Sequence, residues 1–200
     1  LLDQVDGHKL LAKLLVQRGI DTPQEVEQFL NPSAYENISA DLFPGMGQAV
    51  NLILTAVAEN KQICVYGDYD ADGVTSTAVL VAMLRAIDAE VSYHIPDRFT
   101  EGYGMDSGVV RNLADDGIDL IITCDCGISN LQEVSLAKEL GLDVIVTDHH
   151  DLPDRLPNQA DVILSPKLLE AEHRAYHLPG AGMAYFLAQA VLEEENQPKL

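Results

Sequence analysis

The sequence contains few cysteines, few cations and no long apolar run, and each shortage excludes a class of protein. Its three cysteines, Cys64, Cys124 and Cys126, are odd in number and lie inside apolar runs, which predicts buried reduced thiols rather than a disulfide scaffold. No segment approaches the ~20 consecutive apolar residues of a membrane-spanning helix. No charged start followed by an apolar run marks a signal peptide. These features predict a soluble, cytoplasmic protein that does not bind membranes.

The shortage of cations is the strongest compositional signal. The chain has 12 Lys and Arg against 32 Asp and Glu, which gives a formal net charge of -20. Such a surface repels phosphate backbones, so we do not expect these 200 residues alone to bind nucleic acid tightly. The excess of carboxylates has two explanations, a solvated surface or a group of carboxylates that converges on metal ions. Only the spacing of the residues can distinguish them.

The length and the first residues bound the domain organisation. Two hundred residues, 47% of them hydrophobic, suffice for one domain with a full core and a small helical attachment. The chain starts with Leu1-Leu2-Asp3 rather than with Met, which predicts a piece of a longer protein.

Short apolar runs alternate with helical patterns through most of the chain. The predicted strands are Gln62–Tyr66, Val91–Ile95, Leu120–Cys124, Asp143–Thr147 and Val162–Leu164. The predicted helices between and after them are Gly73–Ile87, Asp106–Ala114, Ser129–Leu140 and Gly180–Glu195, with a polar end over Glu193–Pro198. This order predicts an α/β fold, a doubly wound and mostly parallel five-stranded sheet with helices on both faces.

The chain before the first strand reads as helical. Helices are predicted over Gly7–Arg18, Thr22–Leu30 and Met46–Ala58, and the proline-containing stretch Asn31–Pro44 is predicted to be a loop. Thr22, Pro23 and Glu25 supply an N-cap, a first-turn proline and an acidic first turn. We therefore expect a helical N-terminal extension over residues 1–45 and the sheet domain over residues 46–200.

Three aspartates, Asp68, Asp70 and Asp72, alternate in the turn after the first predicted strand. Carboxylates placed this closely repel one another unless cations lie between them. A calcium EF-hand loop also begins with this alternation, but position twelve counted from Asp68 is Val79 where that loop needs a Glu, and a strand precedes the motif instead of a helix. The motif therefore predicts a different kind of cation site.

Further metal-ligating residue types follow the third and fourth predicted strands. Asp125 follows one, and His149 and His150 follow the other. Ligands of open α/β sheets bind outside the carboxyl ends of the strands, so these side chains are expected near the three aspartates. A set of carboxylates and imidazoles without thiolates fits Mn²⁺ or Mg²⁺, and a pair of such ions catalyses phosphoester hydrolysis.

Four segments carry a family resemblance. GDYDADGVTSTA at 67–78, HIPDRFTEGYG at 94–104, TCDCGIS at 123–129 and VTDHH at 146–150 resemble successive motifs of the DHH phosphoesterase superfamily, and within it the RecJ-type single-stranded-DNA exonucleases. The three-Asp motif and the Asp-His-His triplet define the superfamily, and the segment at 94–104 favours the RecJ type. The resemblance implies a 5′-to-3′ single-stranded-DNA exonuclease of DNA repair and recombination, with two Mn²⁺ or Mg²⁺ ions.

Carried over position by position, the resemblance implies the roles of individual residues. Asp70, Asp72, Asp125 and His149 match metal ligands, whereas the positions of Asp68 and His150 match a ligand, a phosphate contact or a residue that supports a ligand. The predicted metal ligands are thus Asp68, Asp70, Asp72, Asp125, His149 and His150, and the predicted catalytic residues are Asp72, Asp125 and His150.

Three further features of the sequence, an arginine, a tyrosine and a glycine-containing helix start, can each be interpreted in two ways. Arg98 is predicted to bind substrate phosphate, or else to pair with Asp97 or Glu101. Tyr103 either stacks on a base or packs on its own domain. Gly180-Ala181-Gly182, at a helix start, either receives a phosphate or allows close helix packing.

The resemblance also implies what the 200 residues lack. It places another metal-ligand Asp and a smaller DHHA1 domain beyond the equivalent of Leu200, so the chain alone is expected to have little or no nuclease activity. Single-stranded DNA is the expected partner of the full-length protein, together with repair or replication proteins. The alternatives are an oligoribonuclease or cyclic-dinucleotide phosphodiesterase of the same superfamily, and a catalytically degenerate replication scaffold.

Overall fold

A computed structural model of the chain describes residues 1–34 and 38–195. These residues form two compact units, Leu1–Ser39 and a second unit that begins at Ala40. The division comes earlier in the chain than the boundary predicted at residue 45. Ala40–Leu42 forms a short 3-10 helix, η3, and the adjacent Phe43 is buried with its ring 5.2 Å from that of Phe186. Ala40 and Phe43 are therefore part of the core of the second unit.

The N-terminal unit is helical, as predicted. Its elements are η1 (Asp3–Val5), α1 (Lys9–Gln17), α2 (Pro23–Leu30) and η2 (Pro32–Ala34). A small core holds it together, made of Val5, Ala12, Leu15 and Val26. The start of α2 has the predicted capping box, because the Thr22 side chain accepts a hydrogen bond from the Glu25 amide and the Glu25 side chain accepts one from the Thr22 amide. The predicted loop at Asn31–Pro44 contains η2 and η3, and its residues 35–37 lie outside the described residues.

The second unit is built on one parallel sheet, which confirms the predicted fold class. The strands are β1 (Ile63–Tyr66), β2 (Val91–His94), β3 (Leu120–Cys124), β4 (Asp143–Thr147) and β5 (Val162–Leu164). Their order across the sheet is β2-β1-β3-β4-β5, and each neighbouring pair is parallel. The strand predictions were correct to within one residue at each end.

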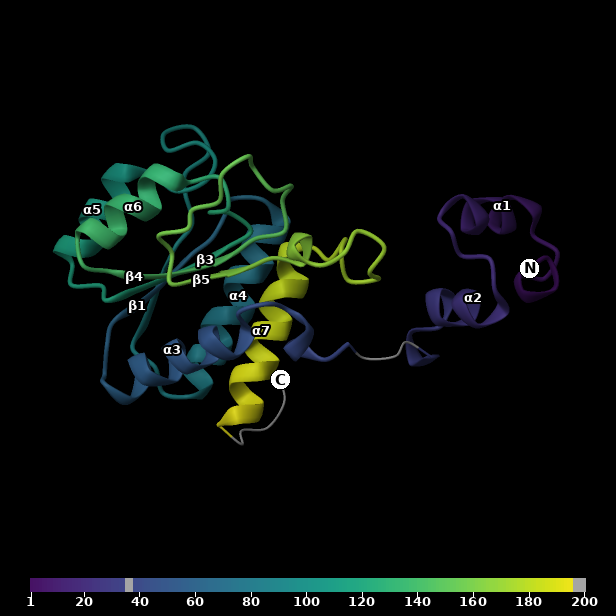
Figure 1. Cartoon of the computed structure of the whole chain (residues 1–200), viewed down its shortest axis with the longest axis horizontal. Helices are drawn as coiled ribbons and strands as arrows, with labels where there is room; N and C mark the ends of the chain where they lie inside the picture. The colour runs from purple at the N-terminus through teal and green to yellow at the C-terminus, as the bar shows by residue number, and fades with distance from the viewer. Residues whose placement is uncertain (35–37, 196–200) are drawn as a thin grey trace. The chain divides into compact units, whose positions relative to one another are not determined.

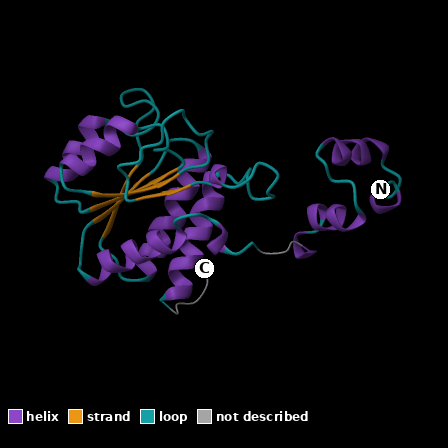
Figure 2. Ribbon diagram, in the orientation of Figure 1, coloured by secondary structure: helices purple, strands orange, loops and turns teal. Residues whose placement is uncertain are grey.

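Helices cover both faces of this sheet (Figures 1 and 2). One face carries α3 (Met46–Ala58), α4 (Ala71–Ala86) and α7 (Gly180–Glu194), and the other carries α5 (Ser107–Asp115) and α6 (Leu131–Glu139). The chain between β5 and α7 includes a last 3-10 helix, η4 (Pro166–Leu168). Of the predicted polar end at Glu193–Pro198, residues 196–198 lie outside the described residues.

The sheet is buried on both faces, which explains why its strands read as continuous apolar runs. Tyr66, Ile121, Val144 and Val146 pack with α5 and α6 in one core cluster. All three cysteines are buried free thiols, as predicted. Burial raises the pKa of Cys64 to about 11 and that of Cys124 to about 12, so both stay protonated at neutral pH.

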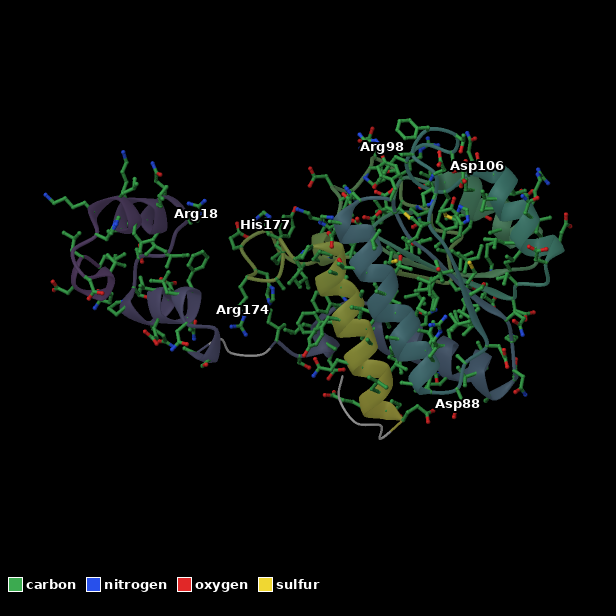
Figure 3. All side chains as sticks on the ribbon, turned by 180° about the vertical axis from the view of Figure 1, so that it is seen from behind. Arg18, Asp88, Arg98, Asp106, Arg174 and His177 are labelled. Atoms are coloured by element: carbon green, nitrogen blue, oxygen red, sulfur yellow. The ribbon has the colours of Figure 1, made fainter. Side chains whose placement is uncertain are left out.

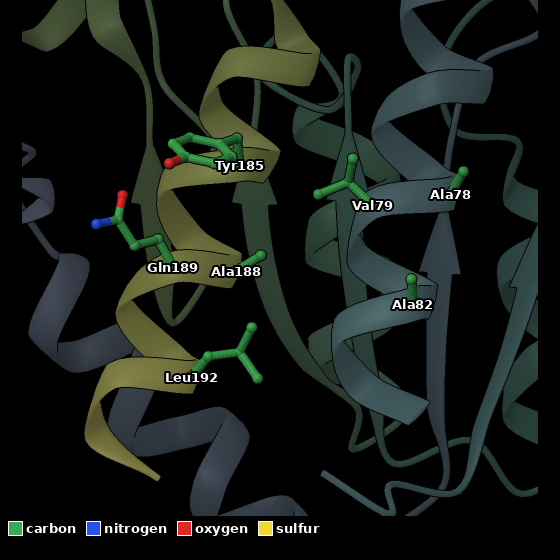
Figure 4. A pocket seen from close by; sticks show the side chains of 7 residues that line it. All are labelled: Ala78, Val79, Ala82, Tyr185, Ala188, Gln189 and Leu192. Atoms are coloured by element: carbon green, nitrogen blue, oxygen red, sulfur yellow. The ribbon is translucent and has the colours of Figure 1, made fainter. Parts of the chain in front are cut away.

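The surface between α4 and α7 forms an apolar groove of about 420 Å³ (Figure 4). Ala78 and Ala82 of α4 line one side, and Tyr185, Ala188 and Leu192 of α7 line the other. No carboxylate, histidine or cation lines this groove, so it does not provide the predicted cation site. In the described part of the chain, none of the helices is both long enough and apolar enough to cross a membrane.

The strand order determines where polar loops meet. From β1 the chain moves outward to β2 on one side of the sheet, and then returns to β3 on the other side. The loops after β1 and β3 therefore diverge at their carboxyl ends and leave a crevice between them, which is the position where open α/β sheets bind ligands. The loop after β1 carries Asp68, Asp70 and Asp72, and the loop after β3 carries Asp125.

Candidate metal centre

The loop after β1 presents two of its three aspartates to the crevice. Asp70 is the N-cap of α4, because its Oδ1 accepts hydrogen bonds from the amides of Asp72 and Gly73 at 2.8 and 3.0 Å. Asp68 is buried, at 3% exposure, and packs against Gly73, where an added Cβ would lie 2.5 Å from the Asp68 carbonyl oxygen. Only glycine fits at position 73, and its presence keeps Asp68 beside the start of α4.

The third aspartate of the loop, Asp72, holds the start of α7. Its Oδ2 accepts a hydrogen bond from the Gly180 amide at 2.8 Å, and its Oδ1 accepts one from the Ala181 amide at 2.7 Å. An added Cβ on Gly180 would lie 2.9 Å from the Cβ of Asp125, so the glycine permits this close approach. The start of α7 therefore packs closely and binds a carboxylate of its own chain, where the sequence left phosphate binding open.

Asp125 lies between the two loops, where β3 ends. Its backbone φ of 61° turns the chain sharply, in a region that Asp tolerates better than most residues. Its side chain is 2% exposed, and its Oδ1 lies 2.9 Å from the Nε2 of His149. The same His149 nitrogen lies 3.4 Å from the Oδ2 of Asp72. His149 thus connects the carboxylates that follow β1 and β3.

The Asp-His-His triplet after β4 is ordered by its first residue. Asp148 is 1% exposed, and its carboxylate accepts hydrogen bonds from the amides of Ile128, His149 and His150. Its Oδ1 also lies 2.8 Å from the Nδ1 of His150. Because this carboxylate is buried and both of its oxygens accept hydrogen bonds within the fold, Asp148 fixes the turn and the His150 ring and is not itself available to an ion.

Two groups of candidate ligands result, and Asp125 belongs to both. One group is Asp68, Asp70 and Asp125, and the other is Asp125, His149 and His150. Within each group the potential ligand atoms lie within 4.8 Å of one another. Asp72 is in neither group, although it contacts His149. The structure thus brings all six predicted metal ligands to one edge of the sheet.

Two buried oxygen atoms test whether this site fits a cation. Asp68 Oδ1 is buried and accepts no hydrogen bond within the described part of the chain. Asp125 Oδ1 is also buried and accepts none of good geometry there, although His149 Nε2 is close. Buried carboxylate oxygens are normally paired, because leaving one without a partner costs about 1 to 3 kcal/mol or more. A divalent cation would satisfy both atoms, so the residues fit Mn²⁺ or Mg²⁺.

The electrostatics of the site agree with this fit. Burial raises the pKa of Asp68 and of Asp125, and the neighbouring aspartates raise both further. The contact with Asp125 raises the pKa of His149, and the contact with Asp148 raises that of His150. In contrast, hydrogen bonds from the start of α4 lower the pKa of Asp70. Without a cation, four of the side chains therefore bind protons more readily than isolated ones would, namely Asp68, Asp125, His149 and His150, whereas Asp70 binds a proton less readily.

The loop at residues 97–104 borders this site and carries two residues that the sequence singled out. The Arg98 guanidinium lies 5.3 Å from the centre of the Tyr69 ring, at the surface of the second unit (Figure 3). Among the described residues, neither Asp97 nor Glu101 forms an ion pair with Arg98: Asp97 caps its own turn and Glu101 contacts His94. The predicted alternative of a surface ion pair is therefore absent there, and Arg98 remains a candidate for phosphate binding.

Tyr103, the second of these residues, contacts the candidate site directly. Its hydroxyl lies 3.0 Å from the Nδ1 of His150 and donates a hydrogen bond to the Asp125 carbonyl oxygen at 3.4 Å. Neither this contact of Tyr103 nor the positioning role of Asp148 was predicted from the sequence. A buried strand that ends in Asp-His-His could have signalled the role of Asp148, whereas nothing local indicates the contact of Tyr103 with His150.

Comparison with known proteins places the chain in a family. The family model described as "DHH family, N-terminal domain" matches residues 62–200. The single-stranded-DNA-specific exonuclease RecJ of Bacillus subtilis is 42% identical over 97% of this chain and 25% of its own length. A crystal structure of exonuclease RecJ bound to manganese is 37% identical, with a TM-score of 0.74, over 82% of this chain and 41% of that one.

A further solved structure, RecJ from Thermus thermophilus in complex with Mg²⁺, is 28% identical, with a TM-score of 0.57, over 92% of this chain and 21% of that one. The chain thus spans less than half of the length of each of these relatives. The family model covers more than half of the chain, including all five strands and every candidate ligand. The chain therefore belongs to the DHH family.

Proposed function

We propose that this chain supplies the metal-binding catalytic centre of an exonuclease that hydrolyses phosphodiester bonds in single-stranded DNA, in DNA repair and recombination. The observation that carries the proposal is the pair of ligand groups that share Asp125 at the crevice of the sheet. The names of the RecJ relatives support the substrate, and the manganese and magnesium in two of their structures support the cofactor.

Each ligand group is suited to one divalent cation. Asp68, Asp70 and Asp125 offer only oxygen ligands, and His149 and His150 add nitrogen ligands beside Asp125. Bound Mn²⁺ or Mg²⁺ would supply an activated water and neutralise charge on the phosphoryl oxygens. Asp72 contributes by holding both His149 and the start of α7.

The chain's own residues supply the remaining functions of the proposed reaction. His150, whose Nδ1 is held by Asp148, would present its Nε2 to the cation or to a phosphoryl oxygen beside it. Arg98, exposed beside Tyr69, can bind a phosphate of the strand. The buried reduced thiols support a cytoplasmic location, and repair or replication proteins as partners remain part of the proposal.

The proposed activity is tested with the whole protein that contains this chain, incubated with Mn²⁺ and 5′-labelled or 3′-labelled substrates. Single-stranded DNA, RNA of the same sequence and short dinucleotides serve as parallel substrates. We expect digestion of single-stranded DNA from the 5′ end and its loss in the Asp72→Ala variant. Faster hydrolysis of RNA or of dinucleotides than of single-stranded DNA would refute the proposed substrate and indicate another kind of phosphodiesterase. If no substrate is hydrolysed in a way that depends on Asp72, the proposed activity is refuted.

The affinity for Mn²⁺ is expected to fall as the pH is lowered from 8 to 6. A cation must displace the proton of His149, whose pKa is raised by Asp125, and the raised pKa of Asp125 itself acts in the same direction. The affinity for Mn²⁺ should therefore rise with pH and level off once the pH exceeds the raised pKa of His149. Isothermal titration calorimetry in two buffers of different ionisation enthalpy would measure the released protons. An affinity that is constant over this range, without proton release, would contradict the role of His149.

A further inference from the structure

We propose that Phe99 is a base-stacking residue, which holds a nucleobase of the single-stranded substrate beside the metal centre. This inference rests on the proposed function, because it assigns a contact for the same substrate. Phe99 is 93% exposed, more than any other large hydrophobic side chain among the described residues, of which the next is Leu10 at 63%. A Phe side chain left in water forgoes the favourable free energy of burying its apolar surface.

The turn that carries Phe99 is well ordered by its own hydrogen bonds. Asp97 Oδ1 accepts hydrogen bonds from the amide of Phe99 at 2.9 Å and from the amide and hydroxyl of Thr100, both at 3.0 Å. The Asp97 carbonyl oxygen accepts a further one from the Glu101 amide at 2.9 Å. These bonds hold the backbone on both sides of Phe99, so the ring projects from a preformed turn.

The turn is also attached to the sheet. Glu101 Oε2 lies 2.6 Å from the Nε2 of His94, the last residue of β2, and both side chains are partly buried. The His94 ring in turn packs on that of Tyr66, the last residue of β1, with 4.9 Å between ring centres. The position of Phe99 relative to the strand ends is thereby fixed, which lowers the entropy lost when a ligand binds.

The loop connects Phe99 to the candidate metal centre at two points. On one side, the neighbouring Arg98 lies over Tyr69, which stands between Asp68 and Asp70. On the other side, Tyr103 contacts His150. Tyr103 follows Phe99 closely in the chain, so their Cα atoms are at most about 14 Å apart. A strand whose phosphate reaches the metal centre can therefore place a nearby base on the Phe99 ring.

The charge of the chain explains why a stacking contact is needed. Because this chain has a net charge of -20, its own residues attract a phosphate backbone only weakly, and Arg98 supplies one cation next to Phe99. Stacking of a base on an aromatic ring does not depend on the phosphate charge and accepts any base, and an aromatic ring combined with a cation is typical of single-strand binding. Stacking on Phe99 therefore lets this acidic chain hold a single strand through its bases, with little attraction to its phosphates.

The test compares binding of a fluorescent 12-nucleotide single strand to the whole protein and its Phe99→Ala, Phe99→Trp and Arg98→Ala variants. Phe29→Ala is the matched control, because Phe29 is 58% exposed in the N-terminal unit. Dissociation constants are measured at several salt concentrations without added divalent cations, so that the strand is not digested. We expect Phe99→Ala to raise the dissociation constant about tenfold or more without changing its salt dependence, and Phe99→Trp to keep the affinity of the unchanged protein. Arg98→Ala should reduce the slope of the logarithm of the affinity against the logarithm of the salt concentration by about 1.

The possible results distinguish a failure of the role of Phe99 from a failure of the proposed function. If Phe99→Ala binds as tightly as the unchanged protein, or if Phe29→Ala loses as much affinity, Phe99 does not stack on a base and the proposed function stands. If the unchanged protein forms no complex with the strand even at low salt, the role of Phe99 is refuted, whereas the proposed function is decided separately by the hydrolysis assay with Mn²⁺. A fold defect is excluded when Phe99→Ala keeps the melting temperature of the unchanged protein and its shift with Mn²⁺.

Discussion

Replacing Asp148 by Ala is expected to lower the free energy of unfolding by about 3 to 5 kcal/mol. The buried carboxylate accepts hydrogen bonds from three backbone amides, those of Ile128, His149 and His150, and contacts the His150 ring. Alanine would leave these donors without a partner inside the protein, and each unsatisfied donor costs about 1 to 3 kcal/mol. Urea unfolding followed by circular dichroism would measure the loss.

Asp151→Ala is the matched control for this variant. The Asp151 side chain is 95% exposed, and its contact with Lys167 at 3.4 Å is a surface ion pair, so the change should stay within about 0.5 kcal/mol. Equal effects of the two substitutions would show that Asp148 does not order the triplet.

The contribution of Asp148 is also expected to depend on pH. Burial opposes its charged form, but the hydrogen bonds from His150 and from the backbone lower its pKa on balance. The stabilisation is then fully present above the unfolded value of about 3.9 and is lost as the pH falls through the lower folded value. The stability difference between the unchanged protein and Asp148→Ala should therefore narrow only below about pH 4.

The second large effect is expected from Asp125→Asn. Asn keeps the size of the side chain but removes the charge that both ligand groups share. In the whole protein we expect the rate of hydrolysis to fall by about a thousandfold or more, because the loss of cation binding removes several kcal/mol of transition-state stabilisation. The stabilisation by Mn²⁺ should disappear as well. Rates and melting temperatures with and without Mn²⁺ would measure both effects.

Without metal, the same variant should be at least as stable as the unchanged protein. Burial and the neighbouring Asp72 and Asp70 raise the pKa of Asp125, so its charge destabilises the metal-free fold at neutral pH. Asp106→Asn is the control, because Asp106 caps α5 away from the ligand groups and Asn caps a helix equally well. An Asp125→Asn variant that still digests DNA and still responds to Mn²⁺ would remove Asp125 from the site.

The sheet could be predicted from the sequence because its signals are local. Each strand is a short apolar run. Two helices were predicted from equally local signals, α2 from its N-cap Thr22 and α3 from the apolar pattern of Met46–Ala58. The convergence of the candidate ligands could also be predicted, since the carboxyl ends of parallel strands lie at the same edge of a sheet. Helix starts were less accurate, and α4 begins two residues before the predicted Gly73 because Asp70 is its cap.

The contacts that organise the site could not be predicted in the same way. The hydrogen bonds of Asp72 to Gly180 and Ala181 join residues more than 100 positions apart, and they leave no periodic pattern in either segment. The contact of Tyr103 with His150 likewise depends on the path of the loop at 97–104. The exposure of Phe99 also depends on the path of this loop and could not be predicted, since Phe is among the residue types that are most often buried.

The binding of Mn²⁺ to this 200-residue chain tests the central claim most directly, through calorimetry combined with thermal unfolding. A cation that binds only the folded cluster should raise the stability by about 2.7 kcal/mol at a hundredfold excess over its dissociation constant, which corresponds to an increase of about 5 to 10 °C in melting temperature. We expect this increase, with measurable heat of binding, for the unchanged chain and for Asp106→Asn, but not for Asp125→Asn. A melting temperature that does not move with Mn²⁺, together with no heat of binding, would contradict a metal centre at this edge of the sheet.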